Sequence, residues 1–418
     1  MYSPSSFYLL GISALALALG VQIILLPWLV VDYLSLTSVW VGWVQAAVLI
    51  PNLVLLLVGG VMADQGKGLP WLLPLLIVNM LIHAGLAIVI YSSWLNIFLV
   101  VCYASLLGVT NAFIQPWREY LLKQTSYASG PVLCAEDLQK FIAKSSLCLY
   151  AGQALGVALA SFMDSLGVEV LLWIQVIMVA IAVLSFWYLR KRLADQYTAS
   201  DIVVDELHAN SSGQQLLLAG LTEVWKLPAL RSLIAIVAFN GFFHIGVFIV
   251  ALPLLVRQVY GETVDFYSGL QLAFVLGTIA TTLIVIYRGF LDAPGRRIIF
   301  GLLYGGVILL ALSARPTLTG LFMLIFCWGV VVGVSANMGR ALVQSLAPEA
   351  SRGRIISIYQ LALFGFAPLG ALFAGYAIEL WGVLVLLKIC GIASLLIFAL
   401  TLTTRALWEV ELKDQSRL

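Results

Sequence analysis

Charged side chains are scarce in this chain. Of its 418 residues, 10% are Asp, Glu, Lys or Arg and 62% are hydrophobic, whereas soluble domains contain about a quarter charged residues. A soluble fold of this length could not bury so much apolar side chain, so the sequence predicts that lipid surrounds most of the chain. The net charge of +2 is too small to indicate a nucleic-acid partner.

Residues that build metal and redox sites are also few. The chain has three histidines, far apart in the sequence, and five cysteines without a C-x-x-C pair. This pattern favours neither a zinc site nor a disulfide framework, so we expect free thiols, no metal and no cofactor. Neither H-E-x-x-H nor G-x-x-x-x-G-K-[ST] occurs, which argues against a membrane hydrolase and an ATP-driven pump.

Long apolar runs dominate instead. A helix that crosses a bilayer needs about 20 mostly apolar residues, and the sequence contains twelve such runs. It therefore predicts an all-α integral membrane protein with twelve transmembrane helices. We place the spans at 7–32, 39–62, 70–92, 94–116, 140–163, 168–189, 232–256, 266–287, 298–314, 317–339, 355–379 and 383–404.

The distribution of basic residues predicts the orientation of these spans. The loops after even-numbered spans, together with both termini, hold nineteen of the 22 lysines and arginines. The other three are Arg257, Arg315 and Lys388. Because cytoplasmic loops carry an excess of Lys and Arg, we expect both termini and the long middle loop on the cytoplasmic side of a bacterial inner membrane.

The order of the spans indicates a duplication. The loop between spans 2 and 3, GGVMADQGKG, and the loop between spans 8 and 9, GFLDAPGRR, both place an aspartate after a glycine, and spans 4 and 10 both combine asparagine, glutamine and arginine. Such matches in the same order and on the same side predict parallel six-helix repeats. The expected parts are an N-terminal bundle at 1–189, a cytoplasmic linker at 190–231, a C-terminal bundle at 232–404 and a cytoplasmic tail at 405–418.

The repeated loops resemble those of the major facilitator superfamily of secondary transporters, whose signature there is Gly-x-x-x-Asp-(Arg/Lys)-x-Gly-x-(Arg/Lys). The segments LTEVWKLPALRSLIAI and SLAPEASRGRIISIYQLALFGFAPLGALFAG resemble its multidrug branch, which contains macrolide-efflux and enterobactin-export proteins. The first loop departs from the signature, because Gln65 replaces the basic residue after the aspartate. The resemblance implies a gating role for Gly60, Asp64, Lys67, Gly289, Asp292, Arg296 and Arg297. Taken alone, the first loop favours a glycine turn with Asp64 as a helix cap, and the second copy at the matching place favours the gate.

Polar side chains inside spans usually face protein or a water-filled cavity. The resemblance implies that spans 1, 4, 7 and 10 line a central cavity, and each of them carries such residues. The cavity candidates are Gln22, Asn111, Gln115, Asn240, His244 and Asn337. Asn111, Gln115, Arg118 and Glu119 share one helical face, as do Asn240 and His244. For each residue, a structural hydrogen bond between helices is the alternative.

A proton-driven transporter needs a group that titrates as access to the cavity changes. The candidates for proton coupling or for a gate are Asp32, Arg118, Glu119, His244 and Arg340. His244 is attractive because imidazole titrates near physiological pH, although a neutral histidine bonded across helices is the alternative. Small residues have a separate role: Gly152-x-x-x-Gly156 in span 5 predicts close helix packing.

The sequence therefore predicts a secondary active transporter, not an enzyme, that works by alternating access. Sparse charge in the expected cavity favours a largely uncharged or amphipathic substrate. With the resemblance to the multidrug branch, we expect proton-coupled export of an amphipathic organic compound of the drug or siderophore type. A proton-coupled uptake symporter for a small organic nutrient is the first alternative, and an intramembrane enzyme or sensor is a remote one. The expected partners are a small-molecule substrate, membrane lipid and a proton or other coupling ion, and we expect a monomer.

Overall fold

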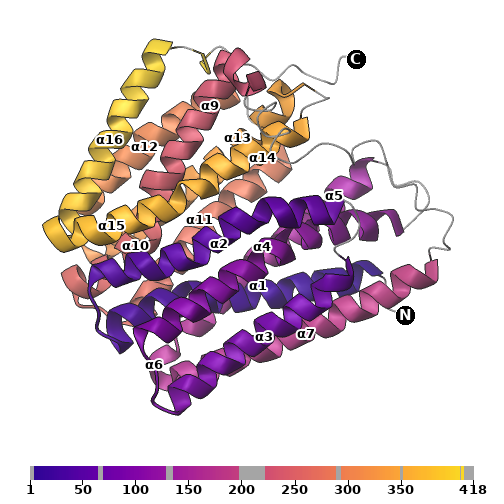
Figure 1. Ribbon diagram of the computed structural model, residues 1–418. Helices are drawn as coiled ribbons and strands as arrows, with labels where there is room; N and C mark the ends of the chain where they lie inside the picture. The colour runs from indigo at the N-terminus through magenta and orange to yellow at the C-terminus, as the bar shows by residue number, and fades with distance from the viewer. Residues whose placement is uncertain are drawn as a thin grey trace. The chain divides into compact units, whose positions relative to one another are not determined.

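The computed structural model describes residues 4–64, 69–128, 135–196, 222–288, 293–348, 352–404 and 406–408. These ranges are almost entirely helical and contain no strand (Figure 1). A helix satisfies its own backbone hydrogen bonds, which lipid cannot do for it. The predicted all-α membrane fold is confirmed.

The first half of the chain begins with a helix that changes its winding near its end. The elements are α1 (Pro4–Trp28), the π-helical turn η1 (Leu29–Tyr33), α2 (Ser38–Asp64), α3 (Leu69–Tyr91), α4 (Ile97–Ala128), α5 (Ala135–Ala160), the short α6 (Met163–Leu166) and α7 (Val168–Gln196).

The second half contains two π-helical segments within a single span. Its elements are α9 (Pro228–Phe239), η3 (Asn240–Gly246), α10 (Val247–Leu254), η4 (Leu255–Tyr260), α11 (Val264–Arg288), α12 (Pro294–Ser313), α13 (Leu318–Leu346), α14 (Arg352–Gly365), α15 (Ala367–Trp381) and α16 (Val383–Thr404).

Eleven segments of the described chain are long and apolar enough to cross a membrane. They match eleven of the twelve predicted spans, and α5 lies at the position of the remaining one. The largest difference in length is in α4, which ends at Ala128 instead of residue 116. Hydropathy locates only the part of a helix that lies in lipid. Good helix formers such as Arg118, Glu119 and Leu121 extend α4 beyond its apolar part.

Two predicted spans are not regular helices. The seventh changes twice from α- to π-helical winding, and the eleventh is interrupted at Phe366, between α14 and α15. Pro368 follows this break within the first turn of α15, where its missing N–H leaves no helical bond unmade. The first and seventh spans share Leu-Pro-x-Leu-Val near their ends, and each becomes π-helical within this sequence.

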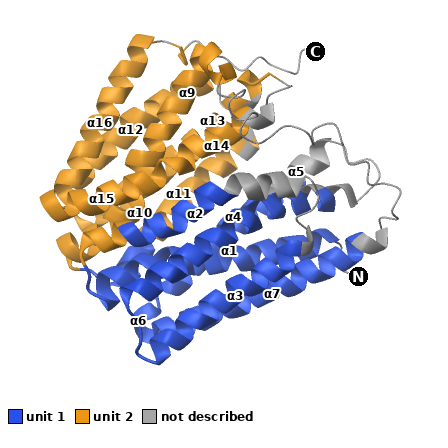
Figure 2. Ribbon diagram, in the orientation of Figure 1, with its two compact units in different colours: residues 1–36, 43–207, 262–269 blue, residues 37–42, 208–261, 270–418 orange. Residues whose placement is uncertain are grey.

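The chain forms two compact units (Figure 2). Unit 1 comprises residues 1–36, 43–207 and 262–269, and unit 2 comprises residues 37–42, 208–261 and 270–418. In unit 1, α1 packs against α5 and α7, and α3 packs against α4 and α7. In unit 2, α12 packs against α13 and α16, and α15 packs against η3 and α10.

Each unit contains a helix crossing that only glycine permits. In unit 1, a Cβ on Gly156 of α5 would lie 2.9 Å from Cα of Gly20 in α1 and would clash with the carbonyl of Leu17. In unit 2, a Cβ on Gly370 of α15 would clash with the carbonyl of Phe242 in η3. The predicted close packing through Gly152 and Gly156 is confirmed, and the same device recurs in unit 2.

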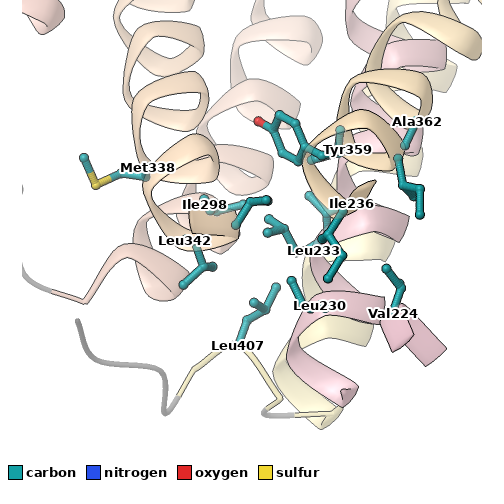
Figure 3. Close-up of a cluster of buried hydrophobic side chains, with 14 of the residues drawn as sticks. Val224, Leu230, Leu233, Ile236, Ile298, Met338, Leu342, Tyr359, Ala362 and Leu407 are labelled. Carbon is teal, nitrogen blue, oxygen red and sulfur yellow. The ribbon is translucent and has the colours of Figure 1, made fainter. Parts of the chain in front are cut away.

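The interior of each unit is apolar. In unit 1 one cluster surrounds Tyr8, Trp117 and Phe186. In unit 2 a cluster joins α9, α12, α13 and α14 to the chain after α16, as Figure 3 shows for Leu230, Leu233, Ile298, Leu342 and Leu407. Where lipid surrounds the helices, such clusters stabilise a unit by close van der Waals packing, because burial from lipid brings no hydrophobic gain.

Large apolar side chains also cover much of the outer surface. Leu155 on α5 is 63% exposed, Leu184 on α7 is 57% exposed and Leu396 on α16 is 65% exposed. A soluble protein of this size rarely leaves so many large apolar residues in contact with solvent. These helices are suited to lipid on their outer sides, as expected for a multi-pass membrane protein.

Candidate functional site: two buried polar networks and a polar helix face

The predicted polar face of the fourth span lies on α4. Asn111, Gln115 and Arg118 are half-buried, and Glu119 is exposed. Nη2 of Arg118 lies 3.3 Å from Oε1 of Glu119, and the two side chains are 19% and 58% exposed. Nε of Arg118 is buried without a hydrogen-bond partner. A guanidinium so weakly paired in an apolar helix is unusual, because a buried charge normally has strong partners.

Gln22, the candidate in the first span, belongs to a buried network inside unit 1. The hydroxyl of Tyr103 in α4 lies 2.7 Å from Oε1 of Gln22 and 2.9 Å from Nδ1 of His83 in α3. Nε2 of Gln175 in α7 lies 3.3 Å both from Oε1 of Gln22 and from the carbonyl oxygen of Ala18. Four spans are thus tied together by polar contacts in an apolar interior.

A single backbone carbonyl sets the direction of these hydrogen bonds. Because the carbonyl of Ala18 can only accept, the Gln175 atom beside it is the amide nitrogen, which also donates to Oε1 of Gln22. The Tyr103 hydroxyl then donates to Oε1 of Gln22 and accepts from His83. His83 therefore carries its proton on Nδ1 and keeps an acceptor lone pair on Nε2.

The network leaves two amide atoms unsatisfied. Nε2 of Gln22, a donor, and Oε1 of Gln175, an acceptor, are buried without partners. Sequence reasoning identified Gln22 but not His83, Tyr103 or Gln175 as its partners. The signal available for Gln175 was a glutamine within an apolar span, but only packing brings it to the first span.

His244, the candidate in the seventh span, lies in the π-helical segment η3 of unit 2 and is 8% exposed. Its Nε2 is 3.2 Å from Oγ of Ser394 in α16, and this Oγ is 2.9 Å from the carbonyl oxygen of Leu302 in α12. The rings of Trp328 and Phe239 are each in a T-shaped arrangement with the imidazole, with ring centres 6.1 Å from its centre. The absence of a side chain at Gly305 makes room for the imidazole, because a Cβ there would lie 2.7 Å from Cε1 of His244.

The other predicted cavity and gate residues have simpler surroundings. Asn240, half-buried, begins η3, and Nδ2 of Asn337 donates to the carbonyl of Gly333 on its own helix at 2.9 Å. Arg340 is exposed on α13. Asp32 is half-buried in η1, where its backbone carbonyl accepts from Ser35 at 2.9 Å.

The predicted gating residues are described only in part. Gly60 and Asp64 belong to the last turns of α2, whereas Lys67, Gly289 and Asp292 lie outside the described residues. Nε of Arg296 donates to the carbonyl of Trp408 at 3.0 Å, and its guanidinium lies 5.4 Å from the centre of the Trp408 ring. Arg297 lies beside it in the first turn of α12.

The structure thus brings some candidates together and leaves others apart. It groups Asn111, Gln115 and Arg118 on α4, but it connects Gln22 to the interior of its own unit and His244 to Ser394. Within the described residues, no group of three His, Cys, Asp or Glu side chains could hold a metal ion. The four described cysteines, Cys102, Cys148, Cys327 and Cys390, are free thiols, as the sequence predicts for them.

Comparisons with known proteins place these features in a wider context. Residues 8–368 match the family model described as Major Facilitator Superfamily. The Staphyloferrin A transporter of Staphylococcus aureus is 24% identical over 369 residues, which cover 86% of each chain.

Solved transporter structures share the fold. The nucleoside transporter NupG superposes with a TM-score of 0.74 at 12% identity, over 98% of this chain and 100% of the other. An auto-inhibited POT family peptide transporter superposes with a TM-score of 0.74 at 14% identity, over 99% and 98%. At these identities the likeness concerns the fold alone.

Proposed function

Because the chain belongs to the Major Facilitator Superfamily and is therefore a secondary transporter, we propose that it exports an amphipathic organic compound of the drug or siderophore type by proton antiport. Export would proceed by alternating access, in which the substrate path opens to one side of the membrane at a time. Each exported molecule would be exchanged for protons that enter the cell.

The observation that carries this proposal is the relationship to the Staphyloferrin A transporter, whose name gives its cargo. The similarity extends over 86% of both chains, so it includes parts of both halves of the chain. It supports a small organic substrate. The low content of charged residues in the spans supports a substrate with substantial apolar surface.

The polar face of α4 is the proposed contact surface for the substrate in unit 1. Asn111 and Gln115 offer both donors and acceptors on neighbouring turns, and Arg118 has a guanidinium nitrogen without a partner. In unit 2 the proposed counterparts are Asn240, His244 and Asn337. Gln22 contributes through its unpaired amide nitrogen. Arg118, Glu119 and Arg340 are proposed as gate residues near the cytoplasmic end.

His244 is the proposed proton carrier. Because the Ser394 hydroxyl donates to the carbonyl of Leu302, it accepts the Nε2 proton of His244. A further proton would therefore bind Nδ1, and the hydrogen bond to Ser394 would survive protonation. Asp32 and Glu119 are the other titratable candidates, and both are partly or fully exposed.

The repeated loops are proposed as gates at the cytoplasmic ends of the spans. Asp64 of the first loop, and Arg296 and Arg297 of the second, are the charged groups whose contacts would change during the transport cycle. With both termini on that side of a bacterial inner membrane, the basic residues lie where the positive-inside rule expects them. The proposed working state is a monomer.

Transport by the purified protein in liposomes tests the proposal. Staphyloferrin A and a fluorescent amphipathic dye serve as probes, and a pH gradient is imposed in either direction. Antiport predicts accumulation of a probe in vesicles with an acidic lumen, because protons leave as the probe enters. Accumulation only when the outside is acidic would indicate uptake by symport. A flux that does not depend on the pH gradient would refute proton coupling.

A further inference from the structure

A short turn after the last span packs back onto the helices of unit 2. It comprises residues 406–408, which follow α16. Leu407 is 2% exposed and belongs to the apolar cluster of α9, α12, α13 and α14, where Figure 3 shows it with Leu230 and Ile298. Trp408, which is half-buried, packs against the same cluster. The last residues of a chain are usually poorly ordered unless contacts tie them down, and Leu407 supplies such a contact.

Glycine at position 295 makes room for the backbone of this turn. A Cβ on Gly295 would overlap the carbonyl oxygen of Leu407. Gly295 follows Pro294, the first residue of α12, where alanine would be the better helix former. The close approach of the turn, and not helix formation, therefore accounts for this glycine. It is also the glycine of the sequence Asp-Ala-Pro-Gly-Arg-Arg in the second gating loop.

The next residue, Arg296, binds the turn with its side chain. Its Nε donates to the backbone carbonyl of Trp408 at 3.0 Å, and its guanidinium lies 5.4 Å from the centre of the Trp408 ring. Phe300 also contacts this ring, with the ring centres 5.9 Å apart. Because Arg296 and Phe300 are four residues apart, they share one face of α12. Trp408 thus lies against two side chains of the same helix face.

These contacts restrict the orientation of the Arg296 guanidinium. The group is planar, and its N–H donors have fixed directions within that plane. Nε is bound to a carbonyl and the guanidinium lies over the indole ring of Trp408, so the plane cannot turn freely. The directions of the terminal N–H groups are therefore set as well. Arg296 is one of the proposed gate residues, and a charged gate depends on where its charged groups point.

We propose that Trp408 is a positioning residue for the gate and that the turn at 406–408 orients Arg296 for the contacts it makes during transport. Leu407 anchors the turn in unit 2, Gly295 admits its backbone, and Trp408 holds the guanidinium. The chain after the last span is thereby a working part of the second gating loop. The gate role of Arg296 rests on the proposed function, whereas the seating of the turn does not.

Limited proteolysis of the full-length protein in detergent tests the seating of the turn. Trypsin cuts after arginine, and Arg405 directly precedes the turn. A cut there requires residues 406–408 to leave their place on α12. Its rate therefore follows the fraction of molecules in which the turn is released. Mass spectrometry measures the fragment that begins at Ala406.

Three variants disturb the contacts of the turn one at a time. Gly295→Ala, Trp408→Leu and Arg296→Gln should each raise the rate of this cut by about fivefold or more, because loss of a cation–π contact shifts an equilibrium by that order and a backbone clash shifts it further. Trp225→Leu is the matched control. Trp225 forms a cation–π contact with Arg231 at 5.7 Å but is 66% exposed, so its replacement should leave the rate unchanged.

Flux in liposomes tests the positioning role. Trp408→Leu should lower the maximal rate several-fold and leave KM unchanged, because Arg296 keeps its charge but loses its orientation. Trp408→Phe keeps an aromatic ring for the guanidinium and should restore most of the rate. The double variant Trp408→Leu with Arg296→Gln should be no slower than Arg296→Gln alone, because the tryptophan acts through the arginine. A merely structural contribution of Trp408 would add to the effect of Arg296→Gln.

Each result decides for or against the proposal. A cut after Arg405 that is equally fast in the unaltered protein and in Gly295→Ala, or that Trp225→Leu accelerates as much, would overturn the seating and the proposal with it. If Gly295→Ala does not fold, Trp408→Leu decides the seating alone. Slow transport by Arg296→Gln with normal transport by Trp408→Leu would keep the gate and refute the positioning role. Full transport by Arg296→Gln would refute the gate role itself.

Discussion

Nε2 of His244 lies 3.2 Å from Oγ of Ser394, and the serine hydroxyl donates a hydrogen bond to the carbonyl oxygen of Leu302 at 2.9 Å. This arrangement makes the serine an acceptor for the histidine, so the neutral imidazole carries its proton on Nε2. A residue of the last span thereby fixes the tautomer of a residue in the seventh.

Replacement of Ser394 by alanine should destabilise unit 2. The Nε2–H group of His244 would be left buried without an acceptor, which costs about 0.6–1.7 kcal/mol in a membrane protein. Thermal unfolding in detergent measures the loss. Ser313→Ala is the matched control, because Ser313 bonds only to a carbonyl one turn earlier in its own helix, and an equal effect of both changes would contradict the assigned role.

His244→Asn should separate proton coupling from substrate movement. Asparagine remains polar but cannot take up a proton, so transport driven by a pH gradient should be lost while exchange of substrate across the membrane at equal pH persists. Liposome flux under the two conditions makes the comparison. His83→Asn removes the other buried histidine and should preserve gradient-driven transport. If His83→Asn loses this transport and His244→Asn keeps it, His83 of unit 1 is the proton carrier.

The network around Tyr103 should behave as one energetic unit. Tyr103→Phe and His83→Leu each leave a buried partner unsatisfied, but the double change removes both members of the pair. We expect their effects on unfolding to be non-additive by about 0.5–3 kcal/mol. Tyr91→Phe is a control because Tyr91 is 85% exposed, and additive losses for the inner pair would show that the 2.9 Å contact contributes little.

Gly156→Ala should force α1 and α5 apart. The new methyl group would overlap the carbonyl of Leu17, and overpacking of this kind costs about 1–3 kcal/mol. A Cβ at Gly85 of α3 would meet nothing within 4 Å, so Gly85→Ala should be neutral or stabilising by about 0.5–1 kcal/mol. Thermal unfolding of the two variants measures these effects. The expectation is contradicted if Gly156→Ala unfolds at a higher temperature than Gly85→Ala.

Asp64→Asn tests the proposed gating loop. The change is nearly isosteric but removes the charge at the end of α2, so transport should fall while expression and membrane insertion stay normal. Flux into vesicles, normalised to the amount of protein, measures the loss of transport. Asp265→Asn, at the start of α11, is the comparison variant, and full activity of Asp64→Asn would leave the loop as a simple turn.

Most of the helical spans could be predicted from the sequence. The spans near residues 70–92 and 383–404 agree with α3 and α16 almost to the residue, because hydropathy follows the thickness of the bilayer. The extension of α4 to Ala128 was missed, since helix formation continues beyond lipid. The break at Phe366 and the π-helical segments were also missed, because they depend on packing against neighbouring helices.

The candidate site was predicted less completely. Polar residues in apolar spans identified Gln22 and His244 as unusual, since each must find a partner or water in lipid. The identity of the partners could not follow from that rule. Tyr103 is 81 residues from Gln22, and Ser394 is 150 residues from His244.

The sequence by itself determined that this protein lies in lipid and which segments are apolar and long enough to cross it, because these properties depend on composition and on the length of apolar runs. The tertiary structure alone decided which side chains meet. It joined His83 to Tyr103 and Gln22, and it placed Trp408 against Arg296. Hydrogen bonds and charges act over a few ångströms in space, and distance along the chain does not report that separation.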